Sequence, residues 1–320
     1  MAVIVHSAGT SRGSGLRASS AWRRRTYLVE LVRLGRPDSA TAVPRDRASR
    51  RPDLLRVRRG TYIEREQWRA ATVSERHRYL VLATVDGLRG PAVLSHESAA
   101  VLHGLPIVGP APQQVHVTSD AARGGRSSAG IRRHRVRTIP TVISIGGVLV
   151  TSVARTVVDL ARGRPLASAL PAADHALRTG AATHEDLMVE LDQVSGARGA
   201  RRARAVVLAA DGRSESVGES VSRARMMELG LPLPDLQREF RDAEGFVART
   251  DFRWENLRLA GEFDGRTKYG AGGAEALWRE KQREDRLRLV VGGVVRWTWV
   301  DAWDVDRFRA VMARAGVVPR

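Results

Sequence analysis

Three acidic residues in the C-terminal third of the chain have the residue types and the spacing of a metal site. Asp251 is followed eleven residues later by Glu262, and Asp264 lies two residues beyond Glu262. Carboxylates that gather on one face of a protein repel one another unless a cation lies between them, and Mg²⁺ prefers oxygen ligands of this kind. The spacing therefore predicts a divalent-metal site, and such a site can activate water for hydrolysis.

Two neighbouring β-strands would bring the first two carboxylates together. The alternation of polar and apolar residues predicts strands at 246–254 and 258–264. If residues 255–258 form the connection between antiparallel strands, Asp251 lies directly opposite Glu262. The register of this one hairpin therefore decides whether the site exists.

The same register accounts for the remaining side chains of the two strands. Side chains alternate between the two faces of a strand, so Asp264 shares the face of Glu262. Phe252 and Phe263 then fall together on the opposite face, where they can be buried. A shorter turn at 255–256 would move Glu262 to a diagonal position on the same face as the aspartate.

The elements around these strands predict one domain over residues 212–320. The segment Ser216–Glu219 has the S-x-x-E pattern of a capping box, so a helix should begin there. Further elements are expected as a strand at 237–240, a helix at 274–291, a strand at 294–300 and a helix from about 304 to 315. The predicted order is α-β-β-β-α-β-α, with Trp297 and Trp299 in the core.

The positive charge is concentrated in the first two thirds of the chain. Of the net charge of +18, residues 1–211 carry most, with 33 of the 53 basic and 17 of the 35 acidic residues. An excess of this size indicates a polyanionic partner, and double-stranded DNA is the partner we expect. The alternative is a merely soluble basic surface in an arginine-rich protein, since the chain has 51 arginines against 2 lysines.

The N-terminal part has the outline of a winged helix-turn-helix. Residues 1–20 lack periodicity and are expected to be disordered. A helical pattern runs from Trp22 to Leu34, and residues 54–63 alternate like a hairpin that turns at Arg59-Gly60. A winged-helix domain is therefore predicted at 21–70, although a basic helix-hairpin module without sequence specificity would share this outline. The arginines expected to contact DNA are Arg45, Arg47, Arg50, Arg51, Arg56, Arg58 and Arg59.

Residues 71–211 are expected to form a mixed α/β middle domain. Helices are predicted at 74–83, 95–102, from 152, at 166–178 and at 184–194, and strands at 114–118, 131–136 and 142–151. His96 and His103 share one helical face, but residue 100 is alanine, so the zinc-protease motif H-E-x-x-H is not formed. We expect these histidines to be packed or to cap a helix.

Three motifs resemble the AbiEi-type antitoxin and transcriptional-regulator family of actinobacteria. They are LRVRRGTY at Leu55–Tyr62, LSHESAAVLHGLP at Leu94–Pro106 and VTSVARTVVDL at Val150–Leu160. The resemblance covers roughly residues 20–210. It implies an N-terminal winged helix that binds DNA, often the promoter DNA of its own operon, and a cognate toxin as partner.

The C-terminal domain resembles the PD-(D/E)XK nuclease superfamily, and within it a Vsr-like domain of unknown function with the motif Glu-x-Asp-Gly-x-x-His. The match covers roughly residues 212–303 and implies a restriction-endonuclease-like fold. By this resemblance Asp251 and Glu262 hold Mg²⁺, and Glu219 on the first helix is an auxiliary catalytic acid.

Two positions depart from the superfamily pattern. Asp264 occupies the place of the usual lysine, where it can act as a third metal ligand but cannot supply a positive charge. Lys268 replaces the histidine of the Vsr-like motif and is the candidate catalytic cation. The alternative for Lys268 is an ordinary surface lysine.

The carboxylates also have structural interpretations. As the alternative to a catalytic role, helix capping alone would explain Glu219. Asp251 and Glu262 could be paired with arginines such as Arg249 or Arg253 in a scaffold without activity.

The α+β multidomain fold expected from these patterns leaves two functions open. The first is a DNA-binding regulator that carries a Mg²⁺-dependent endonuclease domain. The second is a non-catalytic regulator or antitoxin, whose nuclease-like domain serves dimerisation or toxin neutralisation. The absence of cysteine fits a reducing, cytoplasmic compartment, and no apolar run is long enough to span a membrane.

Overall fold

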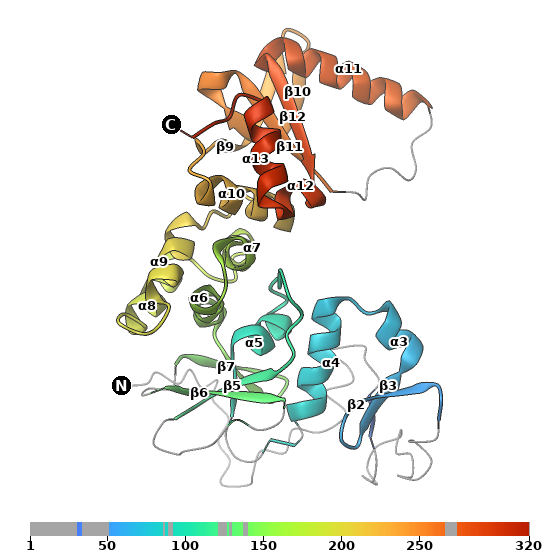
Figure 1. Ribbon diagram of the computed structural model, residues 1–320, viewed down its shortest axis with the longest axis vertical. Helices are drawn as coiled ribbons and strands as arrows, with labels where there is room; N and C mark the ends of the chain where they lie inside the picture. The colour runs from blue at the N-terminus through green and yellow to red at the C-terminus, as the bar shows by residue number, and fades with distance from the viewer. Residues whose placement is uncertain are drawn as a thin grey trace. The chain divides into compact units, whose positions relative to one another are not determined.

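Figure 1 shows the computed structural model of the chain. The structure describes residues 31–33, 51–85, 87–88, 92–120, 127, 130–136, 140–265 and 274–319. The fold is mixed α/β, and its contacts divide it into two units, residues 1–160 and residues 161–320. Each unit is described by itself.

A small three-stranded sheet opens the described part of the first unit. Strands β2 (Leu54–Arg58) and β3 (Thr61–Glu64) form the predicted hairpin. Its turn includes Gly60, whose φ of +79° favours glycine. Strand β1 (Val32–Arg33) pairs with the other edge of β3, so the sheet order is β1-β3-β2.

Strand β1 corrects one prediction. The helix expected from Trp22 to Leu34 is wrong at Val32–Arg33, where the backbone is extended and pairs with Tyr62 and Thr61. This pairing supplies partners to an edge of β3 that would otherwise be open. The rest of that predicted helix up to residue 30, the segment 1–20 and residues 34–50 lie outside the described residues.

A five-stranded sheet forms the core of the first unit. Its order is β6-β5-β4-β8-β7, with β5 parallel to β6, β4 parallel to β8 and the other pairs antiparallel. The strands are β4 (Val93–Leu94), β5 (Val115–Asp120), β6 (Ile131–Val136), β7 (Val142–Ile145) and β8 (Val148–Thr151). The single strand predicted at 142–151 is therefore a hairpin, because Gly146 and Gly147 both have positive φ and turn the chain.

Helices α4 (Val73–Val85) and α5 (His96–His103) match predicted helices, and α3 (Arg65–Ala70) precedes them. Val81 of α4 and Ala99 and Val101 of α5 join buried residues of β4, β5 and β8 in one apolar core. This packing fixes the start of α5 above the sheet.

The next four helices are α6 (Val153–Gly163), α7 (Leu166–Arg178), α8 (His184–Gln193) and α9 (Ala200–Ala209). Helices α6, α7 and α8 match the predictions, whereas α9, which contains Arg201, Arg202 and Arg204, was not predicted. In the second unit, Asp174 of α7 forms a buried ion pair of 2.8 Å with Arg223 of helix α10 (Val217–Glu228). Within the described residues, no helix has both the length and the apolarity to cross a membrane.

The C-terminal elements follow the predicted order. They are α10 (Val217–Glu228), β9 (Asp235–Asp242), β10 (Gly245–Trp254), the 3₁₀ turn η2 (Glu255–Leu257), β11 (Leu259–Asp264), α11 (Ala274–Val291), β12 (Gly293–Thr298), α12 (Trp299–Trp303) and α13 (Val305–Arg314). Strands β9, β10 and β11 are antiparallel neighbours, and β12 lies parallel to β11. A parallel neighbour requires a crossover, which α11 provides.

Both faces of this sheet are covered by helices. On one face, Phe252 and Trp297 contact each other, and Trp297 also contacts Phe308 of α13. On the other face, Leu287 and Val291 of α11 belong to a core with residues of β9, β10 and β11. Trp297 is buried as predicted.

Trp299 does not belong to this core. It is 36% exposed, begins helix α12 instead of continuing the strand, and meets the ring of Phe263 edge-on. The strand predicted at 294–300 ends at Thr298 because Thr298 and Asp301 form a capping box that starts the helix.

Candidate functional site

The hairpin of β10 and β11 has the register that places the two carboxylates opposite each other. The connection consists of η2 and Arg258, whose φ is +48°, and Trp254 pairs with Leu259 across it. The last paired residues are Phe252 and Gly261. The next residues in this register are Asp251 and Glu262, so the predicted four-residue connection is confirmed.

Asp251 lies in a buried, negatively charged environment. Its Oδ2 accepts a hydrogen bond of 2.8 Å from the backbone N–H of Phe263, and its Oδ1 lies 3.5 Å from the side-chain nitrogen of Gln237. The pKa of Asp251 is raised to about 6, mainly by burial and then by the charges of Glu219 and Glu262, which together outweigh the lowering effect of the hydrogen bonds from Phe263 and Gln237. The three carboxylates therefore act on one another electrostatically.

Gln237 connects Asp251 to helix α10. Its Nε2 donates a hydrogen bond of 2.9 Å to Oε2 of Glu219. The backbone of Gln237 has a φ of +54°, which is uncommon for a residue other than glycine and occurs often at functional sites. This conformation places one amide group between two carboxylates from different elements.

Glu219 serves both the helix start and the acidic cluster. Ser216 caps α10 by accepting a hydrogen bond from the Glu219 backbone N–H at 3.2 Å. The Glu219 side chain accepts a hydrogen bond of 2.8 Å from the backbone N–H of Glu215. Its carboxylate is buried yet also contacts Gln237, so capping explains only part of its environment.

Glu262 is held by arginines from two elements. Its Oε2 accepts a hydrogen bond of 2.8 Å from Nε of Arg296, and its Oε1 lies 3.7 Å from Arg283 of α11. Arg296 is the residue across from Glu262 in the parallel pairing of β11 with β12. It also donates a hydrogen bond of 2.7 Å to Glu284.

The two arginines suggested by the sequence have other partners. Arg249 donates to Glu215 at 2.7 Å, and Arg253 donates to Glu255 at 3.1 Å. The arginine pairing expected for an inactive scaffold therefore occurs at Glu262, with different arginines. Among the described residues, Asp251 forms no ion pair with an arginine or lysine.

The other predicted site residues are less informative. Asp264 is half-buried at the end of β11 and pairs with Thr298 of β12. It shares the strand face of Glu262, as predicted. Lys268 lies outside the described residues.

The described residues contain no group of three acidic side chains whose oxygens lie within 4.8 Å of one another, so a divalent cation at Asp251 stays a prediction. The Asp251 carboxylate is half-buried beside two other acids, and the raised pKa reports the cost of holding negative charge there. A bound Mg²⁺ would offset that cost with its own charge. At Glu262, Arg296 would compete with a metal for Oε2.

Exposed arginines lie on the N-terminal hairpin. Arg56 on β2 and Arg59 in the turn are exposed, and Arg51 forms an exposed ion pair with Asp53. Arg58 has a different environment, because its guanidinium donates hydrogen bonds to Thr84 and to the carbonyl of Gly130. Arg45, Arg47 and Arg50 lie outside the described residues.

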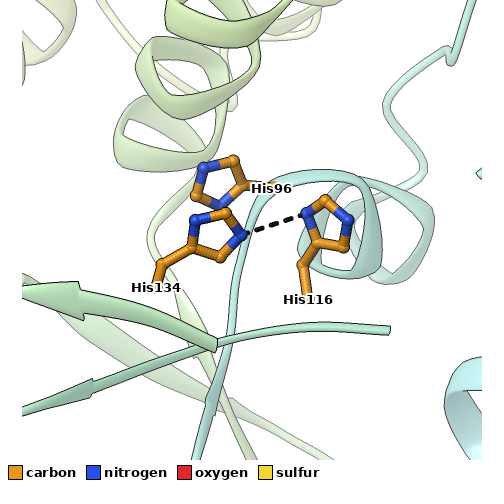
Figure 2. Close-up of side chains that lie close together, drawn as sticks. All are labelled: His96, His116 and His134. Atoms are coloured by element: carbon orange, nitrogen blue, oxygen red, sulfur yellow. Dashed lines mark hydrogen bonds between the residues drawn. The ribbon is translucent and has the colours of Figure 1, made fainter. Parts of the chain in front are cut away.

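Sequence reasoning missed a cluster of three histidines in the first unit. His96, His116 and His134 lie side by side (Figure 2), with one ring nitrogen of each within 4.8 Å of the others. No local sequence signal marks this cluster, because it depends on the parallel pairing of β5 and β6, in which His134 lies across from Thr118 and therefore shares a face with His116. His103, in contrast, hydrogen-bonds the carbonyl of Thr151 at 2.7 Å, as expected of a packed histidine.

Two relatives were found among known proteins. Both are described as uncharacterized proteins of Mycobacterium tuberculosis, one from strain CDC 1551 / Oshkosh and one from strain ATCC 25618 / H37Rv. Each is 34% identical over 199 residues, which cover 62% of this chain and 71% of the relative. No protein-family model matches the chain.

Proposed function

The chain belongs to the family of these two mycobacterial proteins, and we propose that it is a DNA-binding regulator whose C-terminal unit carries a Mg²⁺-dependent endonuclease site. The observation that carries the enzymatic part is the register that sets Asp251 opposite Glu262, with Glu219 joined to Asp251 through Gln237. The order α10-β9-β10-β11-α11-β12 supports it, because it is the order of PD-(D/E)XK nucleases.

DNA binding is supported by the N-terminal sheet and by charge. The hairpin's second strand pairs with an earlier strand, in the order β1-β3-β2, and this arrangement resembles the sheet of a winged helix. Arg56 and Arg59 are exposed on this hairpin, where a wing contacts phosphate. The net charge of +18 adds long-range attraction to a polyanion.

In the proposed site, each residue has a distinct role. Asp251 and Glu262 hold the cation, and Glu219 fixes the orientation of Asp251 through Gln237. Mg²⁺ supplies activation of a water molecule and neutralisation of charge on the attacked phosphate. Arg296, once released from Glu262, provides the positive charge that the lysine position occupied by Asp264 lacks.

The test is a cleavage assay with purified protein, Mg²⁺ or Mn²⁺, and supercoiled plasmid or mismatched duplex. We expect nicking that stops in a chelator and falls at least about 100-fold in Asp251→Asn, because that change removes a charge from the metal ligand but preserves its shape. Asp235→Asn, an exposed change on β9, is the matched control and should cleave normally. The absence of cleavage by the wild type with either metal and either DNA would refute the enzymatic part.

The second candidate is a regulator without catalysis, favoured by the ion pair between Arg296 and Glu262. In that case the pair is permanent, and the C-terminal unit serves dimerisation or the neutralisation of a toxin. Mg²⁺ would then leave the thermal stability of the wild type and of Asp251→Asn equally unchanged. A rise in thermal stability on addition of Mg²⁺, seen in the wild type but not in Asp251→Asn, would exclude this candidate.

A further inference from the structure

The histidine cluster of the first unit is separate from the acidic site and needs its own explanation. His96 begins α5, His116 lies on β5 and His134 lies on β6. Their rings converge in Figure 2. His96 stacks on His134 with 3.7 Å between ring centroids and an interplanar angle of 16°.

The closest nitrogen atoms have the separation of a tetrahedral metal site. Nε2 of His134 lies 3.3 Å from Nδ1 of His116. In a tetrahedral site with Zn–N bonds of about 2.0–2.1 Å, neighbouring ligand atoms lie about 3.4 Å apart. The third ligand atom, from His96, lies within 4.8 Å of the other two, and the His96 ring has to turn out of its stack on His134 to reach the same centre.

An acidic residue stands beside the imidazoles. Oε2 of Glu97 lies 3.0 Å from the same Nδ1 of His116. Both side chains are only 13% exposed. This carboxylate oxygen neighbours one of the candidate ligand nitrogens, and zinc accepts such oxygen ligands.

The backbone at His96 supports a role for its side chain. Its φ is +51°, in the left-handed region that residues other than glycine rarely adopt. Ordinary helix starts do not require this conformation, since the preceding Ser95 has the extended geometry of an N-cap. The strained residue is the one that joins the helix to the histidines of the sheet, and such strain occurs where a site is held in place.

We infer that His96, His116 and His134 form a binding site for a divalent transition-metal ion, with Zn²⁺ as the ion and Glu97 as a neighbouring carboxylate. Three imidazoles suit zinc, whereas Mg²⁺ prefers oxygen ligands and belongs to the chemistry of the acidic site. A metal at this place joins α5 to β5 and β6. The inference does not depend on endonuclease activity.

The test measures metal binding by the full-length protein. After removal of metals with a chelator and desalting, the protein is titrated with ZnCl₂ in a calorimeter. We expect about one equivalent of Zn²⁺ to bind tightly to the protein. His116→Gln and His134→Gln should each weaken it by more than about 100-fold, because they remove a direct ligand and not merely an outer partner.

Two control variants separate this site from other metal binding. His184→Gln removes an exposed histidine from α8 and should bind zinc like the wild type. Asp251→Asn disrupts the acidic site and should still bind one equivalent of Zn²⁺, like the wild type. Loss of zinc binding in Asp251→Asn with retention in His116→Gln would assign the metal to the acidic site and overturn the inference.

A spectroscopic measurement on the wild type needs no variant. Co²⁺ in a tetrahedral nitrogen site gives intense visible absorption bands, and addition of Zn²⁺ should remove them. Weak octahedral Co²⁺ bands, or no stoichiometric uptake of either metal by the folded protein, would overturn the inference. Equal uptake by folded wild type and folded His116→Gln/His134→Gln double variant would do so as well.

Discussion

Replacing Asp251 by asparagine should stabilise the metal-free protein at neutral pH. The substitution keeps an oxygen that accepts the hydrogen bond from Phe263, but it removes the negative charge beside Glu219 and Glu262. The pKa of Asp251 rises from an ordinary 3.8 to about 6 on folding, mainly through burial. At about 1.4 kcal/mol per pKa unit, a rise of this size corresponds to at most about 2–3 kcal/mol of lost stability.

The sign of the pH dependence follows from proton binding. Between about pH 4 and pH 6 the folded state holds the Asp251 proton and the unfolded state has lost it, so stability falls as the pH rises through this range. Below this range the aspartate is protonated in both states. Above pH 6 it is charged in both states, and the loss of folding stability caused by its charge is constant. Asp251→Asn should therefore match the wild type near pH 4 and exceed it above pH 6.

The measurement is urea denaturation in a chelator at pH 4.5 and pH 7.5, with Asp235→Asn as the surface control. We expect the excess in unfolding free energy of Asp251→Asn over the wild type to grow by about 1–2 kcal/mol from pH 4.5 to pH 7.5. A stability advantage that is absent at pH 7.5, or equal at both pH values, would refute the reasoning that burial and the neighbouring carboxylates raise the pKa of Asp251 on folding.

Three further predictions concern other parts of the molecule. Arg56→Ala should weaken duplex DNA binding, and the slope of log affinity against log salt concentration should fall by the contribution of about one phosphate contact. An unchanged slope in filter-binding measurements would contradict that contact. Asp174→Ala leaves buried Arg223 without its carboxylate and should cost about 3–5 kcal/mol of unfolding free energy in urea, whereas a loss below 1 kcal/mol would contradict the importance of this pair. Gly218→Ala puts a Cβ 2.0 Å from the ring of Phe263 and should lower unfolding free energy by about 1–3 kcal/mol; an unchanged urea midpoint would show that the ring moves without cost.

The local elements of the C-terminal unit could be predicted from sequence because their signals are local. The helix at Ala274–Val291 has its expected bounds, and α10 begins after the capping residue Ser216. The β10–β11 register was also predictable, since only an even connection places the acids together on one face while burying Phe252. These features depend on residues within one hairpin or one helix turn.

The missed features depend on contacts between distant segments. Val32–Arg33 are extended because β3 pairs with them about 30 residues later, and nothing in the local helical pattern records that partner. Arg296 contacts Glu262 because β12 is parallel to β11, and the sequence cannot select one arginine from 51 without that register. His116 and His134 meet for the same reason, through the parallel pairing of β5 and β6.

The negative charge at the acidic site is balanced in two different ways. Asp251 has no described cationic partner and takes up a proton more readily than an ordinary aspartate, whereas Glu262 is paired with Arg296. That ion pair is partly open to solvent, with the two side chains 18% and 35% exposed, and pairs of this kind contribute about 0–1 kcal/mol. Binding a divalent cation at Glu262 therefore costs little in lost pairing, and relief of the repulsion at Asp251 can outweigh that cost. In the proposed site the arginine would be a weak competitor for Glu262, so its presence is compatible with metal binding.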